Sequence, residues 1–331
     1  MARKVTLFTG QWADLPFTEL IGKVKSFGYD GVELCCWGDH FNVEEAAKSR
    51  TYCRERRAAL EKTGLGCWAI SNHLAGQLVG DPNNDARSDG FCSDKSCHGD
   101  AEKKRAWAVR QMKLTARAAK NMEIGVVNGF VGSPVWHMWY SFPPCGPKDI
   151  DQGFARIKAL WNPILAEFKR CGVKFALEVH PTEIAYDLWS AERLLKEFDR
   201  DPVFGFNFDP SHLFWQGVDP VRFLKKFPDR IYHVHMKDAA VNLDGENGIL
   251  GSHLNFGDLR RGWDFKSLGH GQVNFDNIIR CLNAMQYEGP LSVEWEDSGM
   301  EREYGAAEAA AFVRKVDFAP SCIAFDAAFD K

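Results

Sequence analysis

The stretch Val173-Lys174-Phe175-Ala176-Leu177-Glu178-Val179-His180-Pro181 is a short, mostly apolar run that closes on polar residues. A helical segment over about residues 191–198 follows it, and after that comes a second apolar run, Val203–Phe208. Strand, helix and strand in this order predict a parallel βαβ unit. The nearly continuous apolar character of both runs indicates strands that are covered on both faces.

The same unit recurs along the whole chain, as eight strand-like runs that are each followed by a helical segment. The expected strands are Val5–Thr9, Gly31–Cys36, Leu65–Ser71, Ile124–Val131, Val173–Val179, Val203–Phe208, Ile231–Met236 and Pro290–Glu294. The expected helices are Phe17–Phe27, Val43–Lys62, Ala101–Met122, Gln152–Arg170, 191–198, Pro220–Phe227, Phe275–Met285 and Arg302–Val316. Eight such repeats predict a closed (β/α)8 TIM barrel of the α/β class. Because no linker rich in Pro, Gly or Ser divides the chain, we expect a single domain over residues 1–331.

The chain has 331 residues, and a plain barrel of this kind needs only about 250. Long loops at residues 74–99, 133–147 and 238–274 and a C-terminal tail at 317–331 account for the surplus. Each of the three loops follows a strand, so we expect them on the carboxyl-end face of the barrel. That face carries the active site in enzymes with this fold.

Composition and charge exclude several classes of protein. A formal net charge of −4 argues against nucleic acid as the partner, because phosphate binding needs clustered Lys and Arg. No apolar run approaches 18 residues, and the first residues lack the apolar segment of a signal peptide. Ten cysteines without a C-x-x-C motif indicate reduced thiols. We therefore expect a cytoplasmic protein that binds neither nucleic acid nor a membrane.

Four ionisable residues stand at the ends of the four late strands, and these are Glu178, Asp209, His235 and Glu294. Barrel closure brings such ends together around the axis. Each residue alone could be an ordinary salt-bridge, capping or core residue, but four in register favour a shared site. Buried together without a cation, they would repel one another and be poorly solvated. Three carboxylates and one imidazole suit a divalent ion, with Mn²⁺ expected ahead of Mg²⁺ and Co²⁺, and Zn²⁺ as a further alternative.

The motifs around these residues resemble those of the xylose-isomerase-like sugar phosphate isomerase/epimerase family. They are E-x-H-P at 178–181, F-D-P-x-H at 208–212, H-x-H-x-K-D at 233–238, and the final V-E at 293–294, with D-G-V-E-L at 30–34 and N-H-L at 72–74 in agreement. The family includes ketose 3-epimerases, inosose dehydratases and endonuclease IV. The resemblance implies that the four residues hold one divalent metal, that Glu178 and Glu294 form the acid/base pair, and that His212 contacts a substrate oxygen. The epimerases carry an Arg where this chain has Val241, which puts a simple ketohexose substrate in doubt.

The chemistry expected at such a site is removal of a proton next to a carbonyl, through an enediolate that the metal stabilises. Return of the proton on the far face gives epimerisation, and transfer to the neighbouring carbon gives isomerisation. If a leaving group stands on the β-carbon, the same intermediate expels it. A lyase or dehydratase acting on 3-keto-glycosides or inososes is therefore the first alternative, ahead of an endonuclease-IV-like repair enzyme and a non-catalytic binding module. The expected partner is a small carbohydrate or keto-sugar, with a homo-oligomer or a small partner subunit as further possibilities.

Two charged side chains follow the ligand positions at the spacing of one strand face. His180 lies two residues beyond Glu178, and could orient substrate or act as a base. Lys237 lies two residues beyond His235, and could bind an anion or simply pair with Asp238. Both are candidates for substrate binding.

Further candidates come from segments that follow other strands, and these are His73, Trp12, Trp37, Trp215 and His137. Indoles stack on sugar faces, although core packing at the barrel rim is an equally good interpretation of the tryptophans. A base at His137, in the loop 133–147, would favour elimination, whereas an exposed histidine is the simpler expectation. Glu33 should face inward, where it could support His73.

Overall fold

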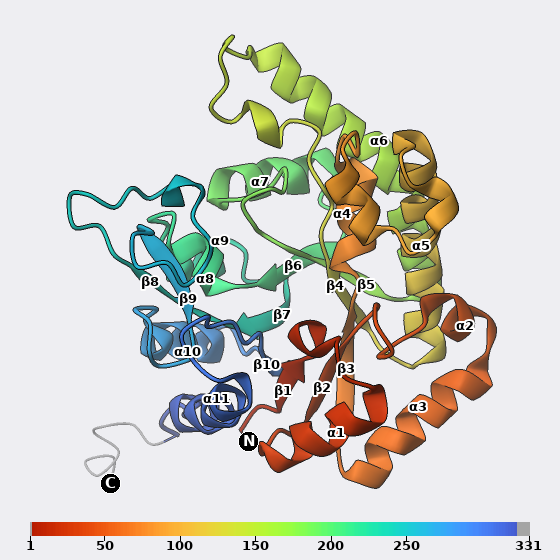
Figure 1. Ribbon diagram of the computed structural model, residues 1–331. Coiled ribbons are helices and arrows are strands. Elements are labelled where there is room, and N and C mark those ends of the chain that lie inside the picture. Colours follow the sequence, from red (N-terminus) through yellow and green to blue (C-terminus); the bar gives the residue numbers. More distant parts are fainter. Residues whose placement is uncertain (1, 323–331) are drawn as a thin grey trace, which may run out of the picture.

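The computed structural model describes residues 2–322, so residues 323–331 of the expected C-terminal tail lie outside the described part. Eight parallel strands form a closed barrel in the order β1-β10-β7-β6-β5-β4-β3-β2, which confirms the expected fold (Figure 1). The strands are β1 (Val5–Phe8), β2 (Gly31–Cys35), β3 (Gly66–Ser71), β4 (Val126–Gly129), β5 (Lys174–Glu178), β6 (Phe204–Phe208), β7 (Ile231–Met236) and β10 (Leu291–Val293).

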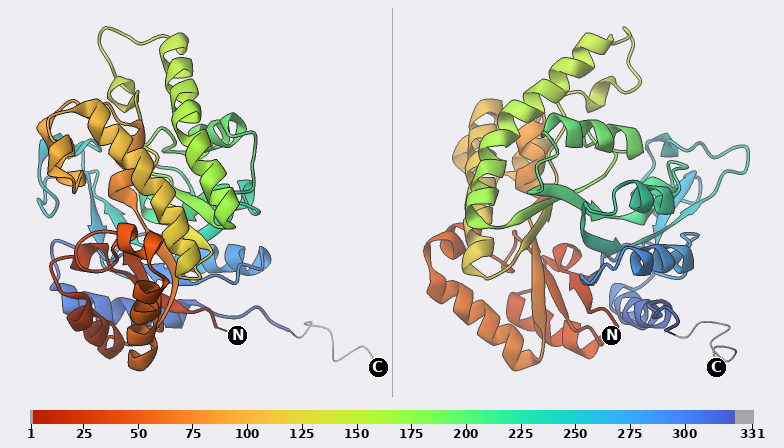
Figure 2. Two further views of the ribbon diagram at one scale, coloured as in Figure 1. Left: turned by 90° about the vertical axis from the view of Figure 1, so that its right-hand side faces the viewer. Right: turned by 180° about the vertical axis from the view of Figure 1, so that it is seen from behind.

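Helices surround the strands, and the two turned views show them on the outside of the barrel (Figure 2). The helices between successive barrel strands include α1 (Phe17–Ser26), α2 (Val43–Lys48), α3 (Arg50–Thr63), α5 (Ala101–Asn121), α6 (Pro147–Cys171), α7 (Leu188–Glu197), α9 (Pro220–Lys226) and α10 (Phe275–Ala284), and α11 (Arg302–Val316) closes the ring. In all views the beginning of α6 and the loop before it project beyond the rest of the barrel. Within residues 2–322, no helix is both long and apolar enough to cross a membrane.

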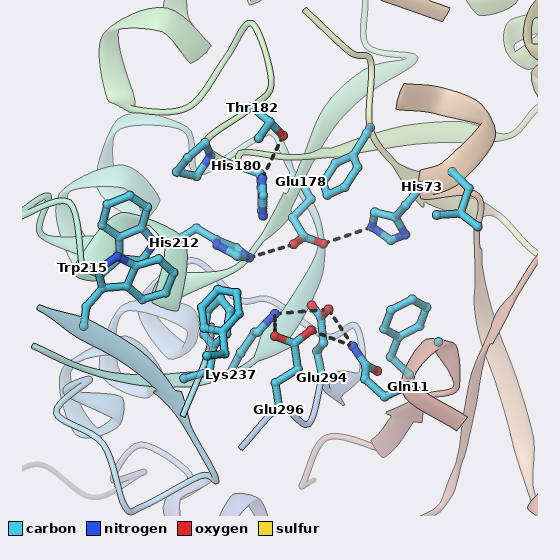
Figure 3. Close-up of a pocket in the computed structure, with 18 of the residues that line it drawn as sticks. Gln11, His73, Glu178, His180, Thr182, His212, Trp215, Lys237, Glu294 and Glu296 are labelled. Atoms are coloured by element: carbon cyan, nitrogen blue, oxygen red, sulfur yellow. Dashed lines mark hydrogen bonds and ion pairs between the residues drawn. The ribbon is translucent and has the colours of Figure 1, made fainter. Parts of the chain in front are cut away.

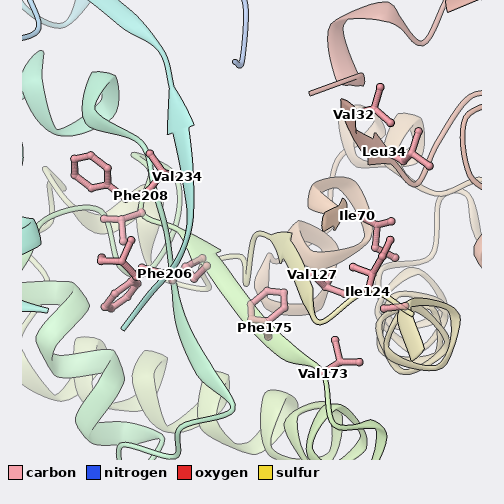
Figure 4. Packing of buried hydrophobic residues seen from close by; sticks show 14 of the residues in the cluster. Val32, Leu34, Ile70, Ile124, Val127, Val173, Phe175, Phe206, Phe208 and Val234 are labelled. Atoms are coloured by element: carbon pink, nitrogen blue, oxygen red, sulfur yellow. The ribbon is translucent and has the colours of Figure 1, made fainter. Parts of the chain in front are cut away.

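Because side chains alternate in direction along each strand, the barrel has an apolar outer layer and a polar inner layer. Val32 and Leu34 of β2 point outward and pack in the main hydrophobic core, as do Phe206 and Phe208 of β6 (Figure 4). Since successive side chains of a strand point to opposite faces, Glu33 points into the barrel instead. The inner layer also holds other buried polar residues from the remaining strands: Ser71, Asn128, Asn207, His233, His235 and Ser292.

The prediction of a single helix over Val43–Lys62 is wrong, because Ser49 interrupts it and separates α2 from α3. Ser49 has an extended backbone with φ −121° and ψ 107°. Its hydroxyl accepts a hydrogen bond from the Tyr52 N–H at 3.2 Å, so it serves as the N-cap of α3. A serine cap satisfies one of the free N–H groups of a new helix, which favours a restart at this point.

Two of the expected loops contain regular structure of their own. The segment 74–99 begins inside a short helix, α4 (His73–Gly80), which packs against α5. The segment 238–274 holds an antiparallel pair, β8 (Asp238–Val241) and β9 (Trp263–Lys266). Another short helix, α8 (Pro210–Phe214), directly follows β6. Segments 74–99 and 238–274 and the helix α8 therefore add regular secondary structure to the carboxyl-end face.

Candidate metal centre

The side chains of Glu178, Asp209, His235 and Glu294 meet at the carboxyl ends of their strands. One ligand atom of each lies within 4.8 Å of the others, and all four residues are buried. Asp209 also caps α8, because its Oδ1 accepts from the Ser211 N–H at 2.8 Å and from the Ser211 hydroxyl at 2.7 Å. This arrangement occupies Oδ1 of Asp209 and turns Oδ2 toward the other three residues.

Several polar atoms at the centre of this cluster have no hydrogen-bond partner among the described residues. They are Asp209 Oδ2, His235 Nδ1 and Glu294 Oε2. His235 Nδ1 lies 2.8 Å from Glu294 Oε2 and 3.2 Å from Glu178 Oε2, but neither contact has hydrogen-bond geometry. Buried polar atoms without partners are rare and call for an explanation. A divalent cation fits, since carboxylate oxygens and an imidazole nitrogen are suitable ligands for it.

The electrostatics of the cluster also favour a positive charge at its centre. Burial opposes a charged His235, but Glu33 and Glu178 outweigh it and raise the pKa of this imidazole well above its usual value. Burial raises the pKa of Asp209. Burial opposes ionisation of Glu294 too, yet Lys237 and His235 lower the pKa of that carboxyl to about 2. Carboxylates held this close repel one another unless a cation lies between them.

A second layer beneath the cluster holds the His235 ring in place. The Glu33 carboxylate accepts the Nε2–H of His235 at 3.0 Å, which leaves Nδ1 as the free ring nitrogen. Glu33 also accepts from His233 at 2.7 Å, from Ser292 at 2.6 Å and from Asn128 at 2.8 Å. The expectation that Glu33 supports His73 is wrong, because β2 points Glu33 toward β7 across the barrel interior.

Glu178 and Glu294 have different neighbours (Figure 3). His73 Nε2 lies 3.1 Å from Glu178 Oε2, and His212 Nε2 lies 3.2 Å from Glu178 Oε1. Glu294 Oε1 instead faces Lys237 Nζ at 3.3 Å and Gln11 Nε2 at 3.0 Å. His235 approaches both carboxylates, but Glu178 has two further histidines beside it, whereas Glu294 has a lysine and an amide.

Lys237 turns into the site rather than toward Asp238. Its ammonium lies 3.3 Å from Glu296 Oε2 as well as from Glu294, and 4.2 Å from the ring centre of Phe265. Burial opposes the charge on Lys237, but Glu294 and Glu296 outweigh it and raise the pKa of the lysine. The alternative of an ion pair with Asp238 is not realised, since Asp238 accepts backbone N–H groups of the loop 269–273.

His180 and Trp37 line the same cavity above the cluster, which has a volume of about 610 Å³. The His180 ring stands edge-on to His212 at 4.1 Å between centres, and its Nδ1 lies 3.3 Å from the Thr182 hydroxyl. Burial and the neighbouring His212 lower the pKa of His180 well below its usual value.

Trp12 and His137 do not join the cavity. Trp12 is fully buried, packs against Phe27 and lies under the Arg302 guanidinium, so the core interpretation holds for this residue. His137 is exposed in the 3-10 turn Trp136–Met138, on the projecting loop before α6. The expectation of substrate contact is therefore wrong for Trp12, and the structure keeps His137 away from the cluster.

Other residues of the site had no signal in the sequence strong enough to identify them. Gln11 follows β1, and position after a strand is only a weak indication that a residue belongs to the site. Glu296 lies two residues beyond Glu294, and this spacing is an equally weak indication. Trp263 and Phe265 come from the β8–β9 pair, which was expected as an irregular loop. Their place in the cavity depends on that pairing.

Comparisons with known proteins agree with this architecture. A family model described as Xylose isomerase-like TIM barrel matches residues 21–316. The uncharacterized protein YfiH of Bacillus subtilis (strain 168) is 26% identical over 331 residues, with 91% of this chain and 95% of that protein covered. An inosose dehydratase of Clostridium perfringens is 26% identical over 199 residues, covering 59% of this chain and 64% of the enzyme. The chain thus aligns with less than two thirds of that dehydratase.

Solved structures with the same fold include a probable dehydratase and an epimerase. The probable 3-DHS dehydratase AsbF from Bacillus anthracis has a TM-score of 0.64 at 21% identity, covering 93% of this chain and 97% of that one. The 3-keto-D-glucoside 4-epimerase YcjR from E. coli has a TM-score of 0.65 at 15% identity, covering 95% and 99%. The IolI protein, solved with a zinc atom, has a TM-score of 0.61 at 16% identity, covering 95% and 96%. At these identities the likeness concerns the fold.

Proposed function

We propose that this chain, which belongs to the xylose isomerase-like TIM barrel family, is a divalent-metal-dependent isomerase or epimerase of a small sugar-like ketone. The observation that supports this function is the set of buried atoms without partners on Asp209, His235 and Glu294, which face a common point. Glu178 completes the ligand set. The three carboxylates favour Mn²⁺ ahead of Mg²⁺, Co²⁺ and Zn²⁺.

When bound, the ion supplies Lewis acidity that stabilises negative charge on a carbonyl oxygen by several kcal/mol. Glu178 and Glu294 project from β5 and from the end of β10, which are separated in the barrel by β6 and β7. One carboxylate can therefore remove a proton next to the carbonyl, and the other can return it on the far face. A proton must pass over hydrogen-bond distance, about 3 Å, so the substrate carbon has to lie between them.

The neighbouring side chains prepare these two carboxylates. His73 and Asn207 each contact Glu178 Oε2 at 3.1 Å, which fixes the orientation of that carboxylate. Lys237 and Gln11 contact Glu294 Oε1, and the lysine favours the ionised form of Glu294. His212 and His180 line the cavity, where their ring nitrogens can contact substrate hydroxyl groups.

A lyase or dehydratase is the second candidate. The inosose dehydratase of Clostridium perfringens supports it, since removal of a proton next to a carbonyl is also the first step of elimination. In that case His180 or Lys237 is available to protonate a leaving group, because both line the cavity beside the two glutamates. We expect a carbohydrate-like substrate in either case, and a homo-oligomer or a small partner subunit remains a prediction that size-exclusion chromatography with light scattering can test.

The deciding experiment uses metal-loaded protein in D₂O with free ketoses, 3-keto-glycosides and inososes, followed by NMR. Deuterium at the carbon next to the carbonyl, with the skeleton retained, identifies an isomerase or epimerase. Release of water or of an aglycone identifies a lyase. Absence of exchange and of elimination with every one of these compounds would overturn the proposal.

Metal content gives an independent check on the same preparation. We expect about one divalent ion per chain by elemental analysis, because one set of ligand atoms is left without hydrogen bonds. Removal of the ion with a chelator should abolish exchange, and Mn²⁺ should restore it. A protein that keeps full activity after complete removal of metal would contradict the assigned ligand set.

A further inference from the structure

Aromatic rings make up a large part of the lining of the cavity above the candidate metal centre. Seven of its nineteen lining residues are Phe or Trp, and these are Phe8, Trp37, Phe130, Trp215, Phe256, Trp263 and Phe265. Polar side chains gather on the floor around Glu178 and Glu294, whereas the rings form the walls (Figure 3). The cavity therefore has a polar end and an aromatic part.

One aromatic wall is built from segments that are far apart in the sequence. The indoles of Trp215 and Trp263 are parallel, with 1° between their planes and 4.3 Å between their centres. Phe265 stands edge-on to Trp263 at 5.1 Å and Phe256 stacks on Phe265 at 5.3 Å. Phe265 also packs edge-on to His212 at 5.5 Å, so this wall begins at the floor of the cavity.

The wall continues to the solvent at Phe256, which is 49% exposed although it lines the cavity. Arg261 lies over Phe256 at 4.2 Å and over Trp263 at 5.1 Å, and thereby helps to hold the outer part of the wall. Packing of the barrel core does not require an aromatic ring at this exposed position. A ligand that passes the mouth of the cavity would cover it.

Most of the polar side chains of the cavity lie on its floor and make contacts with one another, although Gln11 Oε1, His73 Nδ1 and the Trp215 indole N–H have no hydrogen-bond partner among the described residues. Gln11 and Lys237 contact both Glu294 and Glu296, and His73 contacts Glu178. Among the described residues, the lining contains no Arg, Asn, Ser or Tyr side chain. A polyol that extended along the wall of Phe256, Trp263 and Phe265 would find few hydrogen-bond partners for its hydroxyl groups there, and burying a hydroxyl without a hydrogen bond is unfavourable.

We infer that the substrate carries an aromatic ring, which stacks in the cavity against the wall formed by Trp215, Trp263, Phe265 and Phe256, while its polar keto part lies at Glu178 and Glu294. This inference rests on the proposed function, because it adds a substrate class to the same site. The two parts of the cavity match the two parts of such a molecule. Ring stacking and burial of apolar surface together provide the recognition of the aromatic part.

Binding of glycosides that differ only in the attached group tests the inference without requiring turnover. Phenyl β-D-glucoside and methyl β-D-glucoside are titrated into the metal-loaded protein by calorimetry. We expect the phenyl compound to bind about tenfold more tightly or better, since stacking and apolar burial favour it. Equal affinities, or failure of the phenyl compound to bind, would overturn the inference.

Variants locate the aromatic group in the cavity. Trp215→Ala should remove most of the preference for the phenyl compound, Phe256→Ala should reduce it, and Trp215→Phe should retain it in part. Phe256 is half exposed, so loss of this ring leaves the fold intact even if Trp215→Ala fails to fold. Trp189→Ala is the matched control, because Trp189 is 69% exposed and lies outside the cavity. An unchanged phenyl preference in Phe256→Ala and in the Trp215 variant that folds would contradict the assigned wall, and so would an equal loss of that preference in Trp189→Ala.

The outcomes also separate this inference from the proposed function. A phenyl preference that depends on Trp215, found in a protein that catalyses no exchange or elimination, supports the aromatic subsite and contradicts the proposed chemistry. Exchange with free ketoses and no phenyl preference supports the chemistry and contradicts the subsite.

Discussion

Two clusters of histidine and carboxylate lie one above the other inside the barrel, and they share His235. The lower cluster consists of Glu33, His233 and His235, and the upper one of Glu178, Asp209, His235 and Glu294. In both, the ligand atoms lie close enough together to hold a metal ion. Their hydrogen bonding differs: Glu33 accepts from several donors, while the upper cluster contains atoms without any partner among the described residues.

This difference shows that proximity of ligand atoms does not make a metal site. In the lower cluster Glu33 accepts hydrogen bonds from His233, His235 and Ser292, so its carboxylate oxygens already have partners. In the upper cluster Asp209 Oδ2, His235 Nδ1 and Glu294 Oε2 face one another without hydrogen bonds, and a bound divalent cation would satisfy all three atoms. His235 links the two, since the proton that Glu33 holds on Nε2 leaves Nδ1 free. We expect the lower cluster to be structural and the upper one to bind metal.

Glu294→Gln provides the strongest test of this contrast. It removes a proposed ligand and a proposed acid/base group, so turnover should fall by about 10²–10⁴-fold or more. Without metal the variant should lose less stability than Glu33→Gln, because Lys237 keeps Glu296 as a partner and the repulsion among the three carboxylates is relieved. Exchange rates by NMR and thermal unfolding without metal check both statements. Near-normal turnover would refute the role of Glu294, and a large loss of metal-free stability would make the upper cluster structural.

Glu33→Gln should reduce mainly the stability of the folded protein and affect the metal site only indirectly. Its amide cannot accept all the donors that converge on Glu33, so the folded state should lose about 3–5 kcal/mol. Metal affinity should fall by about 10–100-fold, because His235 loses the partner that orients it. Denaturant unfolding and metal titration measure these effects. Glu308→Gln is the matched control, since Glu308 pairs with His270 at 2.8 Å on the surface and its loss should change stability little.

Ser292→Ala is a milder change in the lower cluster. It removes one hydrogen bond of 2.6 Å to Glu33 and leaves the other donors in place. A hydrogen bond to a charged group contributes about 1.5–3 kcal/mol, so we expect a loss near the lower end of that range. Unfolding of Ser26→Ala, where an exposed serine donates to a backbone carbonyl, gives the baseline. If Ser292→Ala lowered the free energy of unfolding as much as Glu33→Gln does, the hydrogen bonds of the lower cluster would depend on one another.

Glu183 extends the comparison to a third buried carboxyl, outside both clusters. Burial and the nearby Asp81 raise the pKa of Glu183 well above its usual value. The folded protein therefore binds a proton more tightly than the unfolded chain, and stability falls as pH rises above the unfolded pKa of about 4.5. Glu183→Gln should remove this dependence, so the variant should gain stability relative to the unaltered protein between about pH 5 and pH 8. The melting temperature across that range tests it, with the exposed Glu288→Gln as control.

The barrel was predictable from the chain because its signals are local. Apolar runs of strand length alternate with amphipathic segments, and eight such repeats close into one ring. The ends of those runs also locate Glu178, Asp209, His235 and Glu294, since parallel strands in a barrel end on the same face. Their assignment as ligands stays a prediction until metal content is measured.

The partners of those residues were not predictable, because they depend on contacts between distant segments. Glu33 lies about 200 positions from His235, and only barrel closure brings its carboxylate under that ring. The same holds for Gln11 beside Glu294 and for the stack of Trp215 on Trp263. Trp12 is the reverse case, because its position after a strand suggested the cavity, whereas helix packing buried it.

The amino-acid order thus specified the repeat and the polar ends of the strands, because strand periodicity and the position of charged residues are properties of short segments. The folded barrel specified which nitrogen of His235 is free, which carboxyls are satisfied and which rings line the cavity. Those properties arise from side chains on different strands that meet in a common interior, where burial makes each missing or completed hydrogen bond matter.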